Sequence, residues 1–290
     1  MPSLVAIKRR IKSAGNISQI TKAMEMVSAS KMKKAQDSTM ASRPFADKLE
    51  SIIENISHSG STVMHPLMRH NDNPQNAMLI IVSTNKGLCG GLNVNLFRKI
   101  SQWEQEESSH LKLNFVHVHK KAKSPIPKTK ESEIVALFHE LGEKPSFEES
   151  RSIAKLAIEA FTAGDVDEVY IAYPKFISTL VNEPTIKRIL PIRTTQEKSL
   201  VNNSNEYVFE PSMEELLQKL VPYQVEMSIF QIITEASASE HSARMVAMKS
   251  ASDNASELID NLTLDYNQAR QTAVTTELLD ATTARMALAN

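Results

Sequence analysis

Cysteine and long apolar runs are scarce in this sequence, and each scarcity excludes a class of protein. Cys89 is the one cysteine in 290 residues, so no internal disulfide can form, which agrees with a reducing compartment. No run approaches the roughly 18 apolar residues that a membrane helix needs, and the first residues lack the apolar core of a secretory signal. We therefore expect a protein that is cytoplasmic, or that is peripheral to a membrane through partners.

Patterns that carry catalysis or ligand binding are also missing. Cys89 has no cysteine or histidine at ligand spacing, so we interpret it as a small buried hydrophobe. The glycine-rich stretch 87–91 (GLCGG) follows a predicted strand, but it does not match GxGxxG, and no GxxxxGK[ST] occurs. A tight turn explains this stretch better than a nucleotide site. The histidines are scattered. The sequence therefore predicts no catalytic site, no cofactor and no metal.

Glycine and proline are rare enough at both ends to allow very long helices. Residues 211–290 contain no glycine and one internal proline, Pro222, so they could form a helix on the order of 110 Å long. A second helical stretch, free of proline, covers residues 3–43. Pro44 removes an amide donor and crowds the preceding turn, so we expect a kink or break near Arg43. Apolar spacing resumes after it and predicts a helix end near Gly60.

Periodic side chains predict that the two long helices pair with each other. In the first helix the stripe is Ile17, Ile20, Met24 and Val27, with small residues around it that permit close approach. In the second helix a three-four alternation typical of a left-handed coiled coil runs through Met245, Met248, Ser252, Ala255, Ile259, Leu262, Tyr266, Ala269 and Ala273. We predict an antiparallel coiled coil with a slender seam.

Between the helices the periodicity changes to that of a small α/β domain. Short β-branched runs predict buried strands, and helical patterns separate them. The expected strands are 77–83, 113–119, 166–173 and an edge strand at 185–191, the expected helices are 93–105 and 147–163, and the expected loops are 120–133 and 194–205. The predicted fold is a small Rossmann-like α/β domain at 61–210, inserted between shaft helices at 1–60 and 211–290.

Charge is balanced overall but uneven along the chain. The net charge of -1 excludes a strongly polyanion-binding protein and argues against a nucleic-acid partner. Between Ile7 and Lys34 one acid, Glu25, stands against eight basic residues: Lys8, Arg9, Arg10, Lys12, Lys22, Lys31, Lys33 and Lys34. This run is either a solvated helix face or a face that meets acidic surfaces of a partner.

Four separated motifs carry a resemblance to a known family. Residues 20–27 (ITKAMEMV) with 28–32 (SASKM), 82–93 (VSTNKGLCGGLN), 243–249 (ARMVAMK) and 269–278 (ARQTAVTTEL) resemble, in order, the signatures of the gamma subunit of bacterial F-type ATP synthase. The resemblance is colinear to about Asp280. Two positions depart from it: Ala284 and Arg285 replace the usual Gly-Ala, and Pro222 lies where the family runs an uninterrupted helix.

The resemblance implies a rotor without catalysis of its own. It implies that the helix pair stands inside a hexamer of alpha and beta subunits, and that the α/β domain meets the epsilon subunit and the c-subunit ring. It places the chain peripherally on the cytoplasmic side of a bacterial inner membrane. It assigns contacts with epsilon or the c ring to Tyr207 and Glu210, and contacts with alpha and beta to Arg9, Arg10, Lys22, Met24, Arg244, Gln271, Thr275 and Glu277.

Other interpretations of these residues and of the chain remain open at this point. Met24 could serve only the helix seam, while Arg244 and Gln271 could be ordinary surface groups. A nucleotide-dependent enzyme would need a phosphate loop in the α/β domain, which the sequence lacks. A plain coiled-coil scaffold would be expected to pair two chains. Copurification with alpha, beta and epsilon subunits would discriminate among these three classes.

Overall fold

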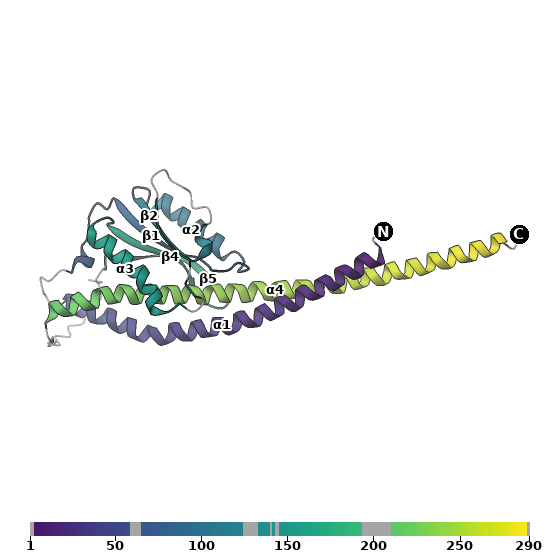
Figure 1. Cartoon of the computed structure of the whole chain (residues 1–290), viewed down its shortest axis with the longest axis horizontal. Helices are drawn as coiled ribbons and strands as arrows, with labels where there is room; N and C mark the ends of the chain where they lie inside the picture. The colour runs from purple at the N-terminus through teal and green to yellow at the C-terminus, as the bar shows by residue number, and fades with distance from the viewer. Residues whose placement is uncertain are drawn as a thin grey trace. The chain divides into compact units, whose positions relative to one another are not determined.

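The computed structural model describes residues 3–58, 65–123, 133–139, 141–142, 145–192, 210 and 212–288 (Figure 1). These residues fall into two compact units. The first, here called the coiled-coil unit, comprises residues 1–28 and 244–290, and the second, the sheet unit, comprises residues 29–243. Two long helices, α1 (Leu4–His58) and α4 (Met213–Leu288), each contribute to both units.

A five-stranded sheet in the order β3-β2-β1-β4-β5 forms the centre of the sheet unit. Its first four strands pair in parallel, and the edge strand β5 runs antiparallel to β4. The strands are β1 (Asn76–Val82), β2 (Lys112–Val118), β3 (Glu133–Phe138), β4 (Glu168–Phe176) and β5 (Asn182–Leu190). The crossover helices are α2 (Leu92–Glu106) and α3 (Phe147–Ala163), and two short 3-10 helices are η1 (Pro66–Met68) and η2 (Lys120–Lys123).

Helices cover both faces of this sheet, which explains the uninterrupted apolar sequence of β1. Met78, Ile80 and Val82 point to a core that α3 and the first part of α4 complete, together with Leu49 and Ile53 of α1. The alternate residues of β1 point to a smaller core against α2. Successive side chains of a strand face opposite ways, so a strand covered on both faces must be apolar throughout.

Local signals at the ends of α3 agree with its packing. The Ser146 side chain accepts from the backbone amide of Glu149, and the Glu149 carboxylate accepts from the Ser146 backbone in return. This capping box satisfies two amide donors that the first helical turn leaves open. Gly164 ends the helix at φ 84°, a left-handed conformation that favours glycine. The expected helix at 147–163 is therefore confirmed to the residue.

The other predicted elements of the α/β domain are also found, with one omission. The strands expected at 77–83, 113–119, 166–173 and 185–191 correspond to β1, β2, β4 and the antiparallel edge strand β5. Strand β3 was missed, because the loop expected over 120–133 ends where it begins and no element was assigned to the residues that follow. Ile134, Val135 and Leu137 of this edge strand are 44 to 51% exposed, so β3 lacks the strong burial pattern that marked the other strands. The boundaries proposed at residues 60 and 210 stay predictions.

Neither proline interrupts its helix, so of the kink or break expected near Arg43 the break is wrong and the kink stays a prediction. Pro44 lies inside α1, and Pro222 lies inside α4. Immediately after Pro44, the ring of Phe45 meets that of Tyr223 edge to face at 5.8 Å between centroids, and Leu49 is buried. A proline costs a helix interior about 3 kcal/mol. Packing of the residues around it offsets this cost, since most helical stability in proteins comes from tertiary contacts.

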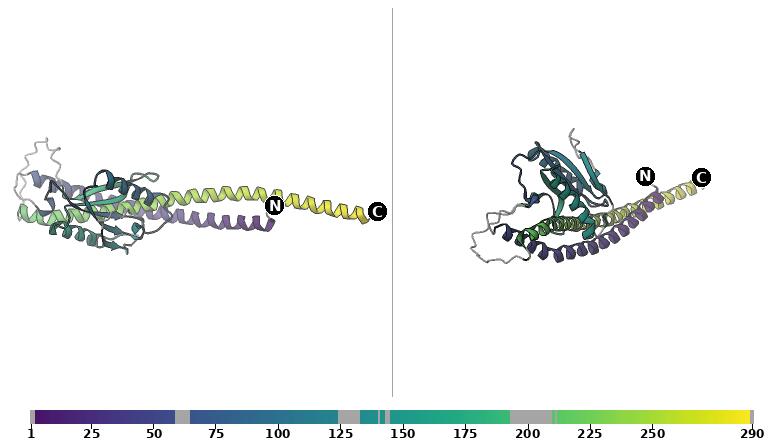
Figure 2. Two further views of the ribbon diagram at one scale, coloured as in Figure 1. Left: turned by 90° about the horizontal axis from the view of Figure 1, so that it is seen from above. Right: turned by 60° about the vertical axis from the view of Figure 1, so that its left-hand side comes forward.

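In the coiled-coil unit the two helices run antiparallel and side by side (Figures 1 and 2). One groove between them is lined by Ala6 and Ala14 of α1 with Ala255 and Leu262 of α4. A second groove joins Ser18 and later residues of α1 to Ser252, Asp253 and Ser256 of α4, whereas the first joins earlier residues of α1 to α4 as far as Leu262. The predicted antiparallel pairing is therefore confirmed within this unit.

The seam residues predicted in α4 are confirmed by their burial. Met248, Ser252, Ala255 and Leu262 are buried, and the other members of the predicted set are half-buried among exposed neighbours. The stripe predicted in α1 is wrong: Ile17, Ile20 and Val27 are 54 to 60% exposed. The less exposed positions of α1 form another three-four alternation, namely Leu4, Ile7, Ile11, Ala14, Ser18, Thr21, Glu25 and Ser28.

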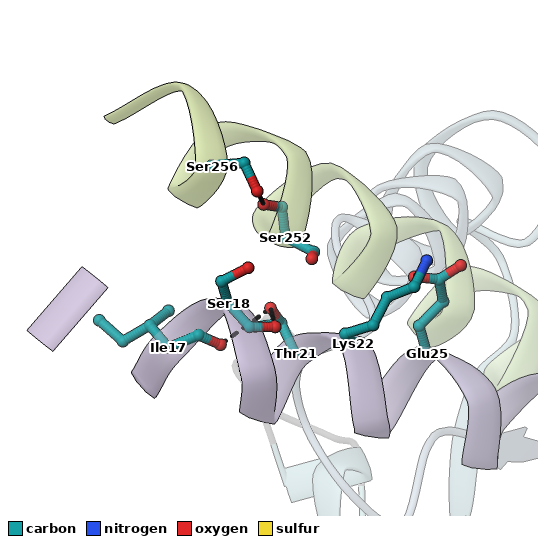
Figure 3. A network of polar contacts seen from close by, with 7 residues as sticks. All are labelled: Ile17, Ser18, Thr21, Lys22, Glu25, Ser252 and Ser256. Atoms are coloured by element: carbon teal, nitrogen blue, oxygen red, sulfur yellow. Dashed lines mark hydrogen bonds and ion pairs between the residues drawn. The ribbon is translucent and has the colours of Figure 1, made fainter. Parts of the chain in front are cut away.

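Small and hydroxylated residues make up much of this seam. Figure 3 shows Ser18 and Ser252 pointing into the space between the helices. Thr21 satisfies its hydroxyl within α1, donating to the carbonyl of Ile17 at 2.9 Å, and Ser256 does the same within α4, donating to Ser252 at 3.1 Å. Such side chains let two backbones approach closely without leaving polar groups unpaired. The result is a thin helix pair in which several large apolar residues of α1, such as Ile17 and Ile20, stay exposed.

Candidate functional site

The exposed surface of α1 in the coiled-coil unit combines basic and apolar side chains, several of which flank the grooves between α1 and α4. Arg9, Arg10 and Lys22 are exposed, as the assignment to a partner surface requires. Lys22 forms an ion pair with Glu25 at 3.0 Å (Figure 3), which at the surface adds little stability. Met24 is half-buried, so it belongs partly to the seam and partly to the surface.

Ile17, Ile20 and Val27 are exposed too, with spacings of three and seven residues along α1, and Ile17 also flanks a groove between the two helices. Each is more than half exposed, and Met26 is 61% exposed. Single exposed apolar residues are ordinary, but a stripe of them along one helix marks an interaction surface. The stripe that sequence periodicity assigned to the intramolecular seam is thus available to another molecule.

The far end of α4 is exposed on all sides. Every described side chain from Val274 to Met286 is exposed. Among the residues assigned to partner contacts, Gln271, Thr275 and Glu277 belong to this exposed region. Leu278 and Leu279 lie beside them at 62 and 60% exposure. This part of α4 is therefore a single helix whose apolar side chains are not buried against any other described residues.

Arg244 differs from these residues, because its side chain is already buried. It is 6% exposed, in a stretch of α4 where His241 and Ser242 are buried too. A buried guanidinium must be paired or hydrogen-bonded to be tolerated. The interpretation of Arg244 as an exposed surface group is therefore wrong, whereas its contact with a partner stays a prediction. Glu210 is exposed, and Tyr207 lies outside the described residues.

The glycine-rich loop between β1 and α2 is held by its own side chains. Asn93 donates from Nδ2 to the Thr84 hydroxyl at 2.7 Å, and its Oδ1 accepts from the Thr84 amide at 3.2 Å. Cys89 is buried beside them, as the sequence predicted. Gly90 takes φ 60°, which favours glycine, and the neighbouring Leu88 takes φ 63° at a conformational cost.

A carboxylate of the same chain binds the backbone amides at the start of this loop. Glu240 of α4 accepts from the backbone amides of Asn85 at 3.1 Å and Lys86 at 3.5 Å. Consecutive amides after a strand are the usual anion-binding element of nucleotide sites. Here the anion that they bind is the carboxylate of Glu240. Burial lowers the pKa of nearby His119, and the negative charge of Glu240 opposes that shift. The expectation of a structural turn is therefore supported by its contacts.

Replacing Glu240 by Ala should release this loop. The change leaves two amides without their acceptor and should lower the free energy of unfolding by about 2 to 4 kcal/mol. Chemical denaturation of the isolated chain measures the loss, and Glu257→Ala, an exposed position on the same helix, is the matched control. Equal stability of the two variants would contradict the role given to Glu240.

The described part of the chain holds no metal-ligand cluster and no membrane-spanning helix. No group of three or more His, Cys, Asp or Glu residues there could hold a metal ion. None of the helices described is long and apolar enough to span a membrane. The features that remain as candidates for function are the outer faces of α1 and α4.

Comparison with known proteins assigns this chain to a family. The family model described as ATP synthase matches residues 3–288. The ATP synthase gamma chain of Desulfitobacterium hafniense is 40% identical over 278 residues, covering 96% of both chains. That of a Roseiflexus species is 40% identical over 292 positions, covering 100% of this chain and 99% of the relative.

The chain belongs to the ATP synthase gamma chain family. Solved structures add that it has the fold of a central-stalk subunit. The rotor of the Euglena gracilis mitochondrial ATP synthase matches with a TM-score of 0.63 at 17% identity, over 93% of this chain and 98% of that one. The central stalk from Tetrahymena thermophila matches with a TM-score of 0.56 at 24% identity, over 80% and 99%. The resemblance drawn from four motifs is confirmed, and so is the fold class.

Proposed function

We propose that this gamma chain is the central rotor stalk of an F-type ATP synthase and carries no catalytic site of its own. The observation that carries the proposal is the helix pair, whose small-residue seam leaves Ile17, Ile20 and Val27 facing outward. A partner that encloses the pair would cover this stripe. Rotation of an asymmetric shaft inside a ring of catalytic subunits would then change their nucleotide affinity in turn, which couples ion flow to ATP synthesis and to its reverse.

The hexamer of alpha and beta subunits is the proposed partner of the coiled-coil unit. Exposure of Arg9, Arg10 and Lys22 supports this contact, because a basic face suits acidic partner surfaces. Exposure of Gln271, Thr275 and Glu277 supports a second contact along the far part of α4. Met24 and Arg244 offer less surface, so we assign them a smaller share of any interface.

The sheet unit is the proposed foot of the stalk, which meets the epsilon subunit and the c-subunit ring. The exposed Glu210 supports this assignment, and Tyr207 is included with it on the family resemblance alone. Through these partners the chain would lie peripherally on the cytoplasmic side of a bacterial inner membrane. Copurification of the chain with alpha, beta and epsilon subunits, followed by ATP-driven ion pumping in membrane vesicles, tests the proposal.

The isolated chain should neither hydrolyse ATP nor bind it at micromolar concentration. Its glycine-rich loop lacks the phosphate-binding lysine of a P-loop, and Glu240 already accepts from the amides of Asn85 and Lys86. Calorimetric titration with MgATP should give no binding heat, and ATPase activity should appear only after alpha and beta subunits are added. Micromolar binding of MgATP to the isolated chain would contradict the proposal that it carries no catalytic site of its own.

A further inference from the structure

The turn that joins β4 to β5 carries three large apolar side chains at its surface. Ile177, Leu180 and Val181 are 51, 79 and 52% exposed. Glycine, proline, asparagine, aspartate and serine dominate turns, and of these the segment 177–181 (ISTLV) includes only Ser178. Apolar residues scattered singly over a surface are ordinary, but three within one short turn mark an interaction surface.

Hydrogen bonds within the turn give it a fixed shape. The amides of Ile177 and Ser178 donate to the Val181 carbonyl at 3.2 and 3.0 Å, and the Val181 amide donates to the Ser178 carbonyl at 3.2 Å. The Ser178 hydroxyl accepts from the same Val181 amide at 3.2 Å. An ordered turn presents the apolar side chains, so a partner need not offset the entropy cost of ordering this backbone.

Helix α4 fastens the turn from one side. The Ser242 hydroxyl donates to the Thr179 carbonyl at 2.6 Å, and the Glu235 carboxylate accepts from the Phe176 amide at 3.3 Å. Glu235 and Ser242 are seven residues apart, so they lie on one face of α4, about two helical turns from each other. Because both bonds lead to the same helix, a force on the apolar side chains passes directly to α4.

The position of the turn along α4 indicates which partner covers it. Ser242 lies two residues before Arg244, the first residue of α4 that is assigned above to the alpha and beta subunits. Glu210, which is assigned to epsilon or the c ring, precedes the start of α4 at Met213. The helix rises about 44 Å from Met213 to Ser242. The turn therefore lies at the end of the sheet unit that is remote from the proposed foot contact.

We propose that the turn 177–181 contacts apolar residues of the hexamer of alpha and beta subunits, an inference that rests on the proposed stalk function. No charged residue occurs between Lys175 and Glu183, so the surface that fits the turn is apolar. Burial of apolar area is non-directional. The same turn can therefore meet successive subunits of a ring as the stalk rotates, whereas an ion pair or hydrogen bond would have to be broken at each step.

Photo-crosslinking of the assembled complex tests this contact. The photoreactive residue p-benzoylphenylalanine replaces Leu180 or, in the control, Lys112, an exposed residue at the amino end of β2. β2 and β4 both run parallel to β1, so Lys112 lies at the edge of the sheet opposite to the carboxyl end of β4, which the turn follows. After irradiation, mass spectrometry should find crosslinks from position 180 to alpha or beta, and none to either subunit from position 112.

Other crosslinking results decide against the proposal. Products from position 180 that join only epsilon, the c subunit, a second copy of the chain or the chain itself would overturn it, and so would the absence of any product. If the complex assembles and pumps ions but gives one of these results, the role of the turn alone is refuted. If the unsubstituted chain does not assemble or pump, the stalk function is refuted instead.

Competitive assembly measures how much the apolar side chains contribute. A variant chain and the unsubstituted chain are mixed in equal amounts with limiting alpha and beta subunits. The combination Leu180→Ser with Val181→Ser should be incorporated at least fivefold less than the unsubstituted chain, whereas Leu180→Met, which stays apolar, should be incorporated equally. The isolated chains should melt alike, because both positions are more than half exposed. Equal incorporation of the serine variant would contradict the proposal.

Discussion

Substitution of Leu262 by Asp should separate the helices of the coiled-coil unit. Leu262 is 4% exposed and lies in the seam, so the change removes apolar contacts and places a carboxylate without a partner between two backbones. We expect a loss of about 3 to 5 kcal/mol, at the upper end of what buried substitutions cost. Circular dichroism during thermal unfolding of the isolated chain should show early loss of helix.

The chain offers a matched control two residues away. Leu264 belongs to the same helix but is 69% exposed, so Leu264→Asp makes the same chemical change on the outer face. It should leave the melting of the isolated chain within a degree or two, since surface substitutions rarely exceed about 0.5 kcal/mol. If both variants melted alike, the seam assigned to α4 would be wrong.

Arg244→Ala should destabilise the isolated chain, contrary to the expectation for a surface arginine. The side chain is 6% exposed, so its removal leaves a void and deprives its surroundings of a buried cation. Breaking a buried charged contact costs about 3 to 5 kcal/mol. Arg9→Ala, at an exposed position, is the control and should not change the melting temperature.

ATP-driven ion pumping by the assembled complex distinguishes two roles of Arg244, one in the fold of the chain and one in binding a partner. If Arg244 serves only the fold of the chain, Arg244→Met should recover part of the stability, because methionine refills the volume, and ion pumping should recover with it. If it also binds a partner carboxylate, stability should recover while pumping stays low. Unchanged melting of Arg244→Ala would contradict its burial.

Sequence patterns predicted the elements of this fold better than their contacts. Strand β1 and helix α3 could be predicted because the residues that determine their burial and capping lie within each element or next to it in the sequence. Strand β3 was overlooked, although residues 134–138 (IVALF) form a short apolar run of the kind that marked the other strands. Pro44 misled for a different reason: proline weakens a helix locally, whereas the contacts of Phe45 and Leu49 that maintain it come from distant residues.

The seam of α1 shows where hydrophobic periodicity fails as a guide. Ile17, Ile20 and Val27 form the more apolar stripe, yet Ala14, Ser18 and Ser28 face the other helix. The three-four repeat that forms the seam mixes large apolar, small and polar residues, so neither hydropathy nor size alone identifies it. The bond between Glu240 and the loop at Asn85 could not be predicted either, because it joins positions 155 residues apart.

The end of α4 has a consequence for when this protein becomes fully ordered. From Val274 onward the helix has no partner among the described residues, and about fifteen residues of single helix are only marginally stable in water. The unassembled subunit should therefore exchange the amides of this stretch rapidly, and slow exchange should appear only once other subunits surround it. The rate of amide exchange in residues 274–288 would therefore report the stage of assembly at which other subunits enclose this end of α4.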